Sequence, residues 1–124
     1  METKLKRRRI LIVEDEAIIG LDIADAVEQA GGEPVGPAAT IAEALQLLDE
    51  GNVKAAICDV NLPDGDIGPV LEELVKGGLP VIVHTGQPLP EHLQARFSDV
   101  LVFRKPTPAD RLADAIESEI ASAR

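Results

Sequence analysis

The sequence predicts an α/β domain in which helices cover both faces of a parallel β-sheet. Short continuous apolar runs, such as residues 10–13, are typical of parallel strands that are buried on both sides. Segments with the apolar spacing of amphipathic helices separate these runs. Strands that alternate with helices at such intervals indicate βαβ units, and the right-handed crossover rule leaves few topologies open.

The predicted strands are rich in Val, Ile, Leu and Ala. They cover residues 10–13, 33–37, 55–60, 80–84 and 100–103. The second strand is short and Pro37 limits its end, because proline cannot donate a ladder hydrogen bond. Residues 61–65 (NLPDG), directly after the third strand, form a dense turn signal.

The predicted helices place apolar residues three and four positions apart. They cover residues 18–30, 41–50, 68–76 and 107–123. Glycines directly after the first three helices predict their C-termini. Thr40 predicts the N-cap of the second helix, and Glu43 completes a capping box with it. Residues 85–99 contain two prolines and only weak periodicity, so the sequence assigns no element there.

The length and composition indicate one folded domain. With 124 residues, we expect a single domain over residues 1–124 with a basic lead-in at residues 1–9. The core must consist of Leu, Ile, Val and Ala, because the chain has two Phe and no Tyr or Trp. A lone cysteine, Cys58, fits a reducing compartment. No apolar run approaches the roughly 20 residues of a membrane span, so we expect a cytoplasmic protein.

The charge is distributed unevenly along the chain. The net charge is −10, yet five of the twelve basic residues lie within residues 4–9. Beyond Arg9, seven basic residues face twenty-one acidic ones, which gives −14. Such a surface repels nucleic acid and anionic lipid. We therefore expect no DNA binding and no membrane association.

Polar residues follow the ends of four predicted strands. Glu14 and Asp15 follow the first strand, Asp59 lies at the end of the third, Thr85 follows the fourth and Lys105 the fifth. Functional sites of open parallel sheets form at the carboxyl ends of the strands. These five side chains are therefore expected to converge at one edge of the sheet.

The convergent groups are those of a phosphoryl-transfer site. Neighbouring carboxylates repel one another unless a cation joins them, and hard oxygen ligands select Mg²⁺ or Ca²⁺. Mg²⁺ suits a phosphate site with few protein ligands. Lys105 adds a compact positive charge for an oxyanion and Thr85 a hydroxyl donor. Asp59 would be the nucleophile and would form an aspartyl phosphate.

Four short motifs carry a family resemblance. They are Glu14-Asp15, Asp59-x-x-x-Pro63-x-Gly65, Thr85-Gly86 and Lys105-Pro106. In this order and spacing they make nearly the whole chain resemble the receiver domain of two-component response regulators. The resemblance implies a doubly wound, flavodoxin-like fold with five helices and a five-stranded parallel sheet of order 2-1-3-4-5.

The resemblance also implies residue roles and partners. Asp59 would accept a phosphoryl group from a histidine kinase or phosphotransfer protein. The phosphorylated chain would then signal to an unknown downstream protein. The chain itself would be a monomer or a weak dimer. The implied Mg²⁺ ligands are Asp15, Asp59, the backbone carbonyl of Asn61 and, through water, Glu14. Lys105 would contact the phosphoryl oxygens, and its bond to Pro106 is usually cis in the family.

The sequence departs from the family pattern at the position of the switch aromatic. Val102 stands at this position, three residues before Lys105, and the neighbouring Phe103 is one place off. We therefore expect the output change to lie mainly in residues 86–97. Asn61 and Gln87 occupy positions that tune dephosphorylation in the family. Thr85-Gly86 without the aromatic is similar to a subgroup of single-domain receivers from alphaproteobacteria.

Other interpretations of the same residues remain open. An inert pseudo-receiver would bind partners without phosphate. A phosphatase with an aspartate nucleophile would usually carry a second Asp where Asn61 stands, so we do not expect an enzyme. Taken singly, Asp59 could be no more than a carboxylate that caps a turn. Glu14, Asp15 and Glu16 could be no more than a solvated acidic run at the start of a helix, where the helix dipole favours acids.

Overall fold

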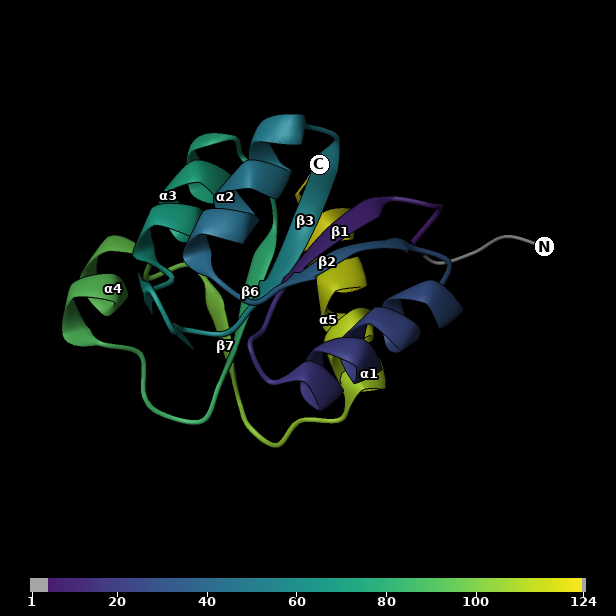
Figure 1. Ribbon diagram of the computed structural model, residues 1–124. Coiled ribbons are helices and arrows are strands. Elements are labelled where there is room, and N and C mark those ends of the chain that lie inside the picture. Colours follow the sequence, from purple (N-terminus) through teal and green to yellow (C-terminus); the bar gives the residue numbers. More distant parts are fainter. Residues whose placement is uncertain (1–4, 124) are drawn as a thin grey trace.

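The computed structural model describes residues 5–123 and contains one five-stranded sheet (Figure 1). Its strands are β1 (Arg9–Val13), β2 (Glu33–Ala38), β3 (Val53–Cys58), β6 (Val81–Thr85) and β7 (Leu101–Arg104). Their order is β2-β1-β3-β6-β7, and all neighbours pair in parallel. The predicted order is therefore confirmed.

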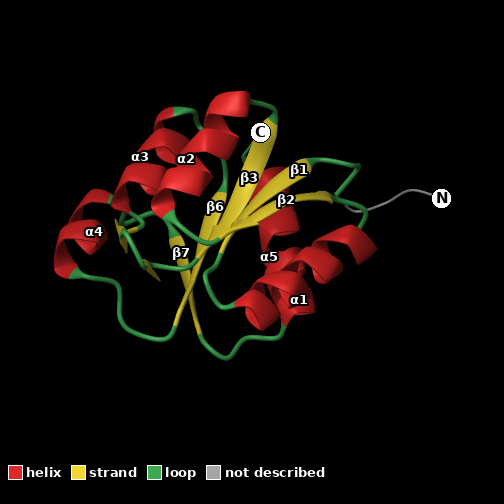
Figure 2. Ribbon diagram, in the orientation of Figure 1, coloured by secondary structure: helices red, strands yellow, loops and turns green. Residues whose placement is uncertain are grey.

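Five helices cover the two faces of the sheet (Figure 2). They are α1 (Ala17–Gln29), α2 (Ile41–Glu50), α3 (Gly68–Lys76), α4 (Glu91–Arg96) and α5 (Ala109–Ser122). α1 and α5 lie on one face, whereas α2, α3 and α4 lie on the other. Side chains of β1 alternate between the two cores, with Ile10 and Ile12 toward α1 and Leu11 and Val13 toward α2.

The segment that the sequence left unassigned contains the shortest helix. Pro90 is the N-cap of α4, so the helix can begin only after the second proline. Leu93 and Phe97, four residues apart, are buried in the core beneath it. Six residues are too few for hydrophobic periodicity to stand out in the sequence.

The predicted turn after β3 is an ordered loop rather than a simple reversal. Within it, β4 (Asn61–Leu62) and β5 (Gly65–Asp66) form a two-stranded antiparallel sheet. β3 itself ends at Cys58, two residues earlier than predicted, so Asp59 lies in the loop. The amide of Asp59 still donates to the carbonyl of Val13 at 2.8 Å, which holds it beside the end of β1.

The described part of the basic lead-in, residues 5–9, is not solvent-exposed throughout, and residues 1–4 lie outside the described residues. Leu5 is fully buried in the core under α1 and α5, and its amide donates to the carbonyl of Ala30. Arg9 is already the first residue of β1. Lys6 and Arg7 are exposed, as expected of a solvated stretch. A single apolar residue among cations gave no periodic signal from which its burial could be inferred.

The N-terminus of α2 is capped from two directions. The hydroxyl of Thr40 accepts from the amide of Glu43 at 3.1 Å, as predicted, and the Glu43 carboxylate accepts from the amide of Ala39. In addition, the Asp64 carboxylate of the β4–β5 loop accepts from the amides of Ile41 and Ala42, at 2.8 and 3.1 Å. The loop after β3 is thereby attached to α2.

Asp66 attaches the same loop to two further helices. Its carboxylate accepts from the amide of Gly68, the first residue of α3, and lies 2.9 Å from the ring of His92 in α4.

None of the described helices is both long and apolar enough to cross a membrane.

The double hydrogen bond to Asp64 predicts a pH-dependent contribution to stability. The hydrogen bond from the Ile41 amide, with that from Ala42, lowers the pKa of Asp64. A lowered pKa in the folded state stabilises the protein above the ordinary carboxyl pKa of about 4, and this stabilisation is lost as the pH falls through the folded pKa. We expect Asp64→Asn to lower Tm near neutral pH, and the difference from the unmodified chain to shrink in acid.

Thermal unfolding followed by circular dichroism at a series of pH values measures this difference. Asp49→Asn is a suitable control, because Asp49 is exposed and its side chain makes no hydrogen bond with another described residue. A loss of stability in Asp64→Asn that is independent of pH would contradict the role of the ionised carboxylate.

Candidate functional site

Three carboxylates meet at the carboxyl end of the sheet. Glu14 and Asp15 follow β1, and Asp59 follows β3, the strand that pairs with β1. One oxygen of each carboxylate lies within 4.8 Å of an oxygen of the others. Their burial differs, since Glu14 and Asp59 are buried whereas Asp15 is exposed. The cluster therefore opens to solvent on the side of Asp15.

Lys105 is the cation of this cluster. Its ammonium nitrogen lies 3.0 Å from an oxygen of Asp59 and 3.0 Å from an oxygen of Glu14. The backbone positions this side chain, because the Lys105 amide donates to the carbonyl of Thr85 at the end of β6. The bond from Lys105 to Pro106 is cis, as the family resemblance implied.

The charges of the cluster do not balance. Burial and, to a smaller extent, the neighbouring Asp59 raise the pKa of Glu14, the hydrogen bond from Lys105 lowers it, and the net result is a pKa of about 7. Burial alone would lower the pKa of Lys105, but its hydrogen bonds with Asp59 and Glu14 outweigh this effect and raise it. One ammonium thus faces three carboxylates, which leaves an excess of negative charge suited to a cation.

The two oxygens of Asp59 have different environments. One accepts from the amide of Val60 at 2.7 Å and the other accepts from Lys105. The carboxylate is thus held in one orientation at the surface end of a buried strand. With 8% of the residue exposed, Asp59 is mostly shielded and only a small part of it is in contact with solvent. This arrangement suits a nucleophile that is fixed in place before a reactant arrives.

The three polar residues around the cluster differ in placement. Thr85 is buried at the end of β6, and its hydroxyl accepts from the amide of Gln87 at 3.2 Å. In the described part of the chain this hydroxyl makes no hydrogen bond with Asp59. Gln87 and Asn61 are exposed on the two loops that border the cluster. Asn61 pairs with Asp66 in the β4–β5 sheet, so its backbone is fixed.

Val102 and Phe103 lie on opposite faces of β7. Val102 is 39% exposed and lines a shallow cavity with Leu89 and Phe97, on the side of α4. Phe103 packs against the core under α1 and α5. Because side chains alternate along a strand, Phe103 cannot replace an aromatic at the position of Val102. The departure inferred from the sequence is therefore a structural one.

Sequence reasoning missed one charged neighbour of the cluster. The carboxylate of Glu16 lies 3.8 Å from the Lys105 ammonium and is mostly exposed. In the sequence, Glu16 belongs to the acidic run at the start of α1. The helix dipole favours acidic residues there, so their presence does not require a functional site. Only the position of Lys105 in space distinguishes the two interpretations.

Comparison with known proteins identifies the family. The family model that describes the response regulator receiver domain matches residues 10–117 of this chain. This chain belongs to the response regulator receiver domain family. Receiver domains act in two-component signalling as regulators and not as enzymes, in agreement with the prediction. The fold just described, with its five parallel strands and five helices, is the receiver fold.

Individual relatives support the assignment. The receiver domain is 34% identical to SdrG from Sphingomonas melonis Fr1, with a TM-score of 0.77 over 97% of this chain and 99% of SdrG. It is 32% identical to PhyR from Brucella abortus, with a TM-score of 0.75 over 96% of this chain and 51% of PhyR. The transcriptional regulatory protein PdtaR of Mycobacterium tuberculosis is 38% identical over 79 residues, which are 63% of this chain.

Two of these relatives, PdtaR and PhyR, are longer than this chain. The aligned segment spans 38% of PdtaR, and this chain covers 51% of Brucella PhyR. The activities and partners of those whole proteins do not follow from the receiver domain alone. The similarity to SdrG, by contrast, extends over nearly all of both chains.

The ion pairs of Lys105 predict a loss of stability when its charge is removed. Without added Mg²⁺, Lys105→Met leaves Glu14 and Asp59 facing each other without a cation. We expect a loss of about 1–3 kcal/mol in the free energy of unfolding, less than for a fully buried pair, because Glu14 can take up a proton.

Urea denaturation near neutral pH measures this loss. Lys76→Met is the matched control, since the Lys76 side chain is 76% exposed and its only ion pair in the described chain is a 4.0 Å contact with Glu73. It should change the free energy of unfolding by less than about 0.5 kcal/mol. Equal effects of the two substitutions would show that Lys105 does not neutralise the cluster.

Proposed function

We propose that this receiver domain accepts a phosphoryl group on Asp59 with the help of Mg²⁺ and signals through the resulting change in conformation. The observation that carries the proposal is the position of Lys105. Its ammonium bonds directly to Asp59 within a cluster of three carboxylates. A lysine and a cation site that share one carboxylate are the groups needed to stabilise a phosphoryl oxyanion.

The donor set fits a hard divalent cation. Asp15, Asp59 and the backbone carbonyl of Asn61 would hold Mg²⁺, and Glu14 would act through water. When bound, Mg²⁺ would offset the charge of the carboxylates and of the incoming phosphoryl oxygens. Asp15 is the exposed member of the cluster, which leaves a side open for both the ion and the phosphodonor.

Asp59 carries the covalent step. A carboxylate oxygen of Asp59 attacks the phosphorus of a phosphohistidine or a small acyl phosphate, and a new P–O bond forms. The bond from phosphorus to the leaving nitrogen or oxygen breaks, and the electron pair departs with the leaving group. Lys105, already hydrogen-bonded to Asp59, stays in place to bind a phosphoryl oxygen.

The modified site would attract Thr85. The phosphoryl group would carry close to two negative charges in place of the single charge of the Asp59 carboxylate, together with three strong acceptors. The Thr85 hydroxyl, now bonded to the Gln87 amide, would turn to donate to a phosphoryl oxygen. Because Val102 replaces the switch aromatic, we place the response mainly in residues 86–97, which include α4. Asn61 and Gln87 would set the dephosphorylation rate by positioning water.

The remaining parts of the proposal concern the cellular context. The phosphodonor would be a histidine kinase or phosphotransfer protein in the cytoplasm, and the output an interaction with another protein. Residues 1–124 would act as one domain, as a monomer or weak dimer, without DNA binding. Phosphodonor assays separate this function from that of a pseudo-receiver, which would take up no phosphate.

Phosphorylation of Asp59 is the decisive prediction. The purified chain is incubated with Mg²⁺ and acetyl phosphate, and its intact mass is measured. We expect a gain of one phosphoryl group, because Asp59 is a fixed and accessible nucleophile beside Lys105. Asp59→Asn should show no gain, and Asp99→Asn, an exposed carboxylate before β7, should behave like the unmodified chain.

A gain that persists in Asp59→Asn would place the phosphoryl group elsewhere. No gain in the folded, unmodified chain would support the pseudo-receiver instead. Removal of the divalent cation with EDTA should abolish the gain, since the cation offsets the charge of the reacting phosphoryl group.

Mg²⁺ binding is predicted independently of phosphorylation. At a Mg²⁺ concentration of ten times Kd, the folded state should gain about 1.4 kcal/mol through mass action. The measurement is Tm as a function of Mg²⁺ concentration. Asp15→Asn should lose this increase because it removes a ligand, whereas Asp99→Asn should retain it. An equal increase in both variants would indicate that the ion acts on the general negative charge of the surface.

A further inference from the structure

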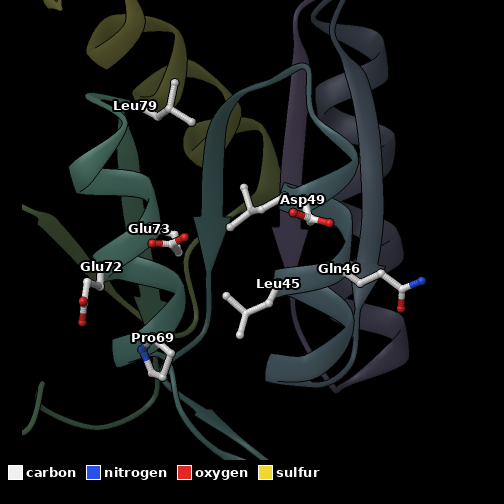
Figure 3. Close-up of a pocket in the computed structure, with 8 residues that line it drawn as sticks. Leu45, Gln46, Asp49, Pro69, Glu72, Glu73 and Leu79 are labelled. Atoms are coloured by element: carbon white, nitrogen blue, oxygen red, sulfur yellow. The ribbon is translucent and has the colours of Figure 1, made fainter.

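A groove separates α2 from α3 on the face of the sheet that α4 also covers. Figure 3 shows the two helices side by side, with Leu45 extending from α2 into the space between them. The groove has a volume of about 750 Å³. The proposed phosphorylation site uses none of its lining residues. It is therefore a separate feature of the surface.

The floor of this groove is apolar. Leu45 and Leu48 of α2 and Leu79, three residues after the end of α3, line it. All three pack against the hydrophobic core and yet remain partly exposed. Three partly exposed leucines that line one hollow form a place where an apolar side chain could displace water.

The rim of the groove is acidic. Asp49 projects from α2, and Glu72 and Glu73 from α3 (Figure 3). Among residues 5–123, no basic residue lines the groove. Asp49 makes no ion pair with any described residue. Glu72 pairs with Arg96 at 2.9 Å and Glu73 approaches Lys76 at 4.0 Å, but all four side chains are at least half exposed. Such exposed ion pairs contribute little to stability, so basic side chains of a partner can take the place of Arg96 and Lys76 beside these carboxylates.

The form of the occupant follows from the backbone. The groove lies between two helices, whose backbone hydrogen bonds are satisfied internally, and offers no free strand edge. A bound segment must therefore satisfy its own backbone groups, which a helix does. α2 and α3 contain ten and nine residues, so the groove matches a helix of two to three turns.

We propose that the α2–α3 groove binds a basic amphipathic helix of a partner protein. Two leucine-type side chains of that helix, one turn apart, contact Leu45, Leu48 and Leu79. Lysine or arginine side chains beside them face Asp49 and Glu73. The surface requires neither Mg²⁺ nor a phosphoryl group, so it stands apart from the function proposed for Asp59.

The test uses two synthetic peptides and the full chain. One peptide is a helix of about 14 residues with Leu at positions i and i+4 and Lys on either side. The other has the same charge, with Ser in place of Leu. Fluorescence anisotropy of each labelled peptide is measured against the chain at an ionic strength of about 0.15 M, where long-range attraction is largely screened.

Two double variants locate the binding site. Asp49→Asn with Glu73→Gln removes rim charges, and both residues are exposed, so the fold should be preserved. Glu28→Gln with Asp110→Asn removes the same charge from α1 and α5, on the opposite face. We expect saturable binding of the Leu peptide, at least about tenfold weaker binding of the Ser peptide, and about a fivefold loss only in the rim variant.

Amide chemical shifts should change along α2 and α3 when the Leu peptide binds. Equal affinity for the two peptides, or equal losses in the two double variants, would indicate attraction to overall charge and overturn the proposal. Absence of binding would overturn it as well. If instead the chain alone self-associates and the rim variant prevents this, the occupant is a second copy and the partner helix is wrong.

Discussion

Repulsion among three carboxylates is the constraint on which this structure depends. The pairing of β1 with β3 holds Glu14, Asp15 and Asp59 next to one another, and they cannot separate while the sheet is intact. Lys105 offsets only part of their charge. The two hydrophobic cores on either face of the sheet supply the stability that the crowded edge removes. The fold thus maintains a place where added positive charge is favourable.

The sequence was sufficient to predict the sheet and the convergence of side chains at its edge. Both predictions follow from the buried apolar strands, because their polar ends are visible in the sequence and must meet in a parallel sheet. Glu14, Asp15, Asp59 and Lys105 lie together as expected, while their chemical roles stay proposals. The distances that decide which oxygen bonds to Lys105 come only from the folded chain.

Features without periodicity escaped prediction for physical reasons. α4 spans only six residues after Pro90, and Leu5 is a single apolar residue in a basic stretch. Asp64 was interpreted as a turn residue, although its carboxylate caps a helix that begins 23 positions earlier in the chain. Contacts of this kind join segments that are distant in sequence, so no local pattern records them.

The attachment of the β4–β5 loop has a consequence for how its length can vary. Asp64 is bonded to α2, while Asp66 is bonded to the first residue of α3 and contacts His92 of α4. Both acids lie within seven residues of Asp59, so the loop between them and Asp59 is short. An inserted or deleted residue between Asp59 and Asp64 would pull at least one carboxylate off its helix. The spacing of this loop is thus set by the three helices it joins, whatever residues occupy its tip.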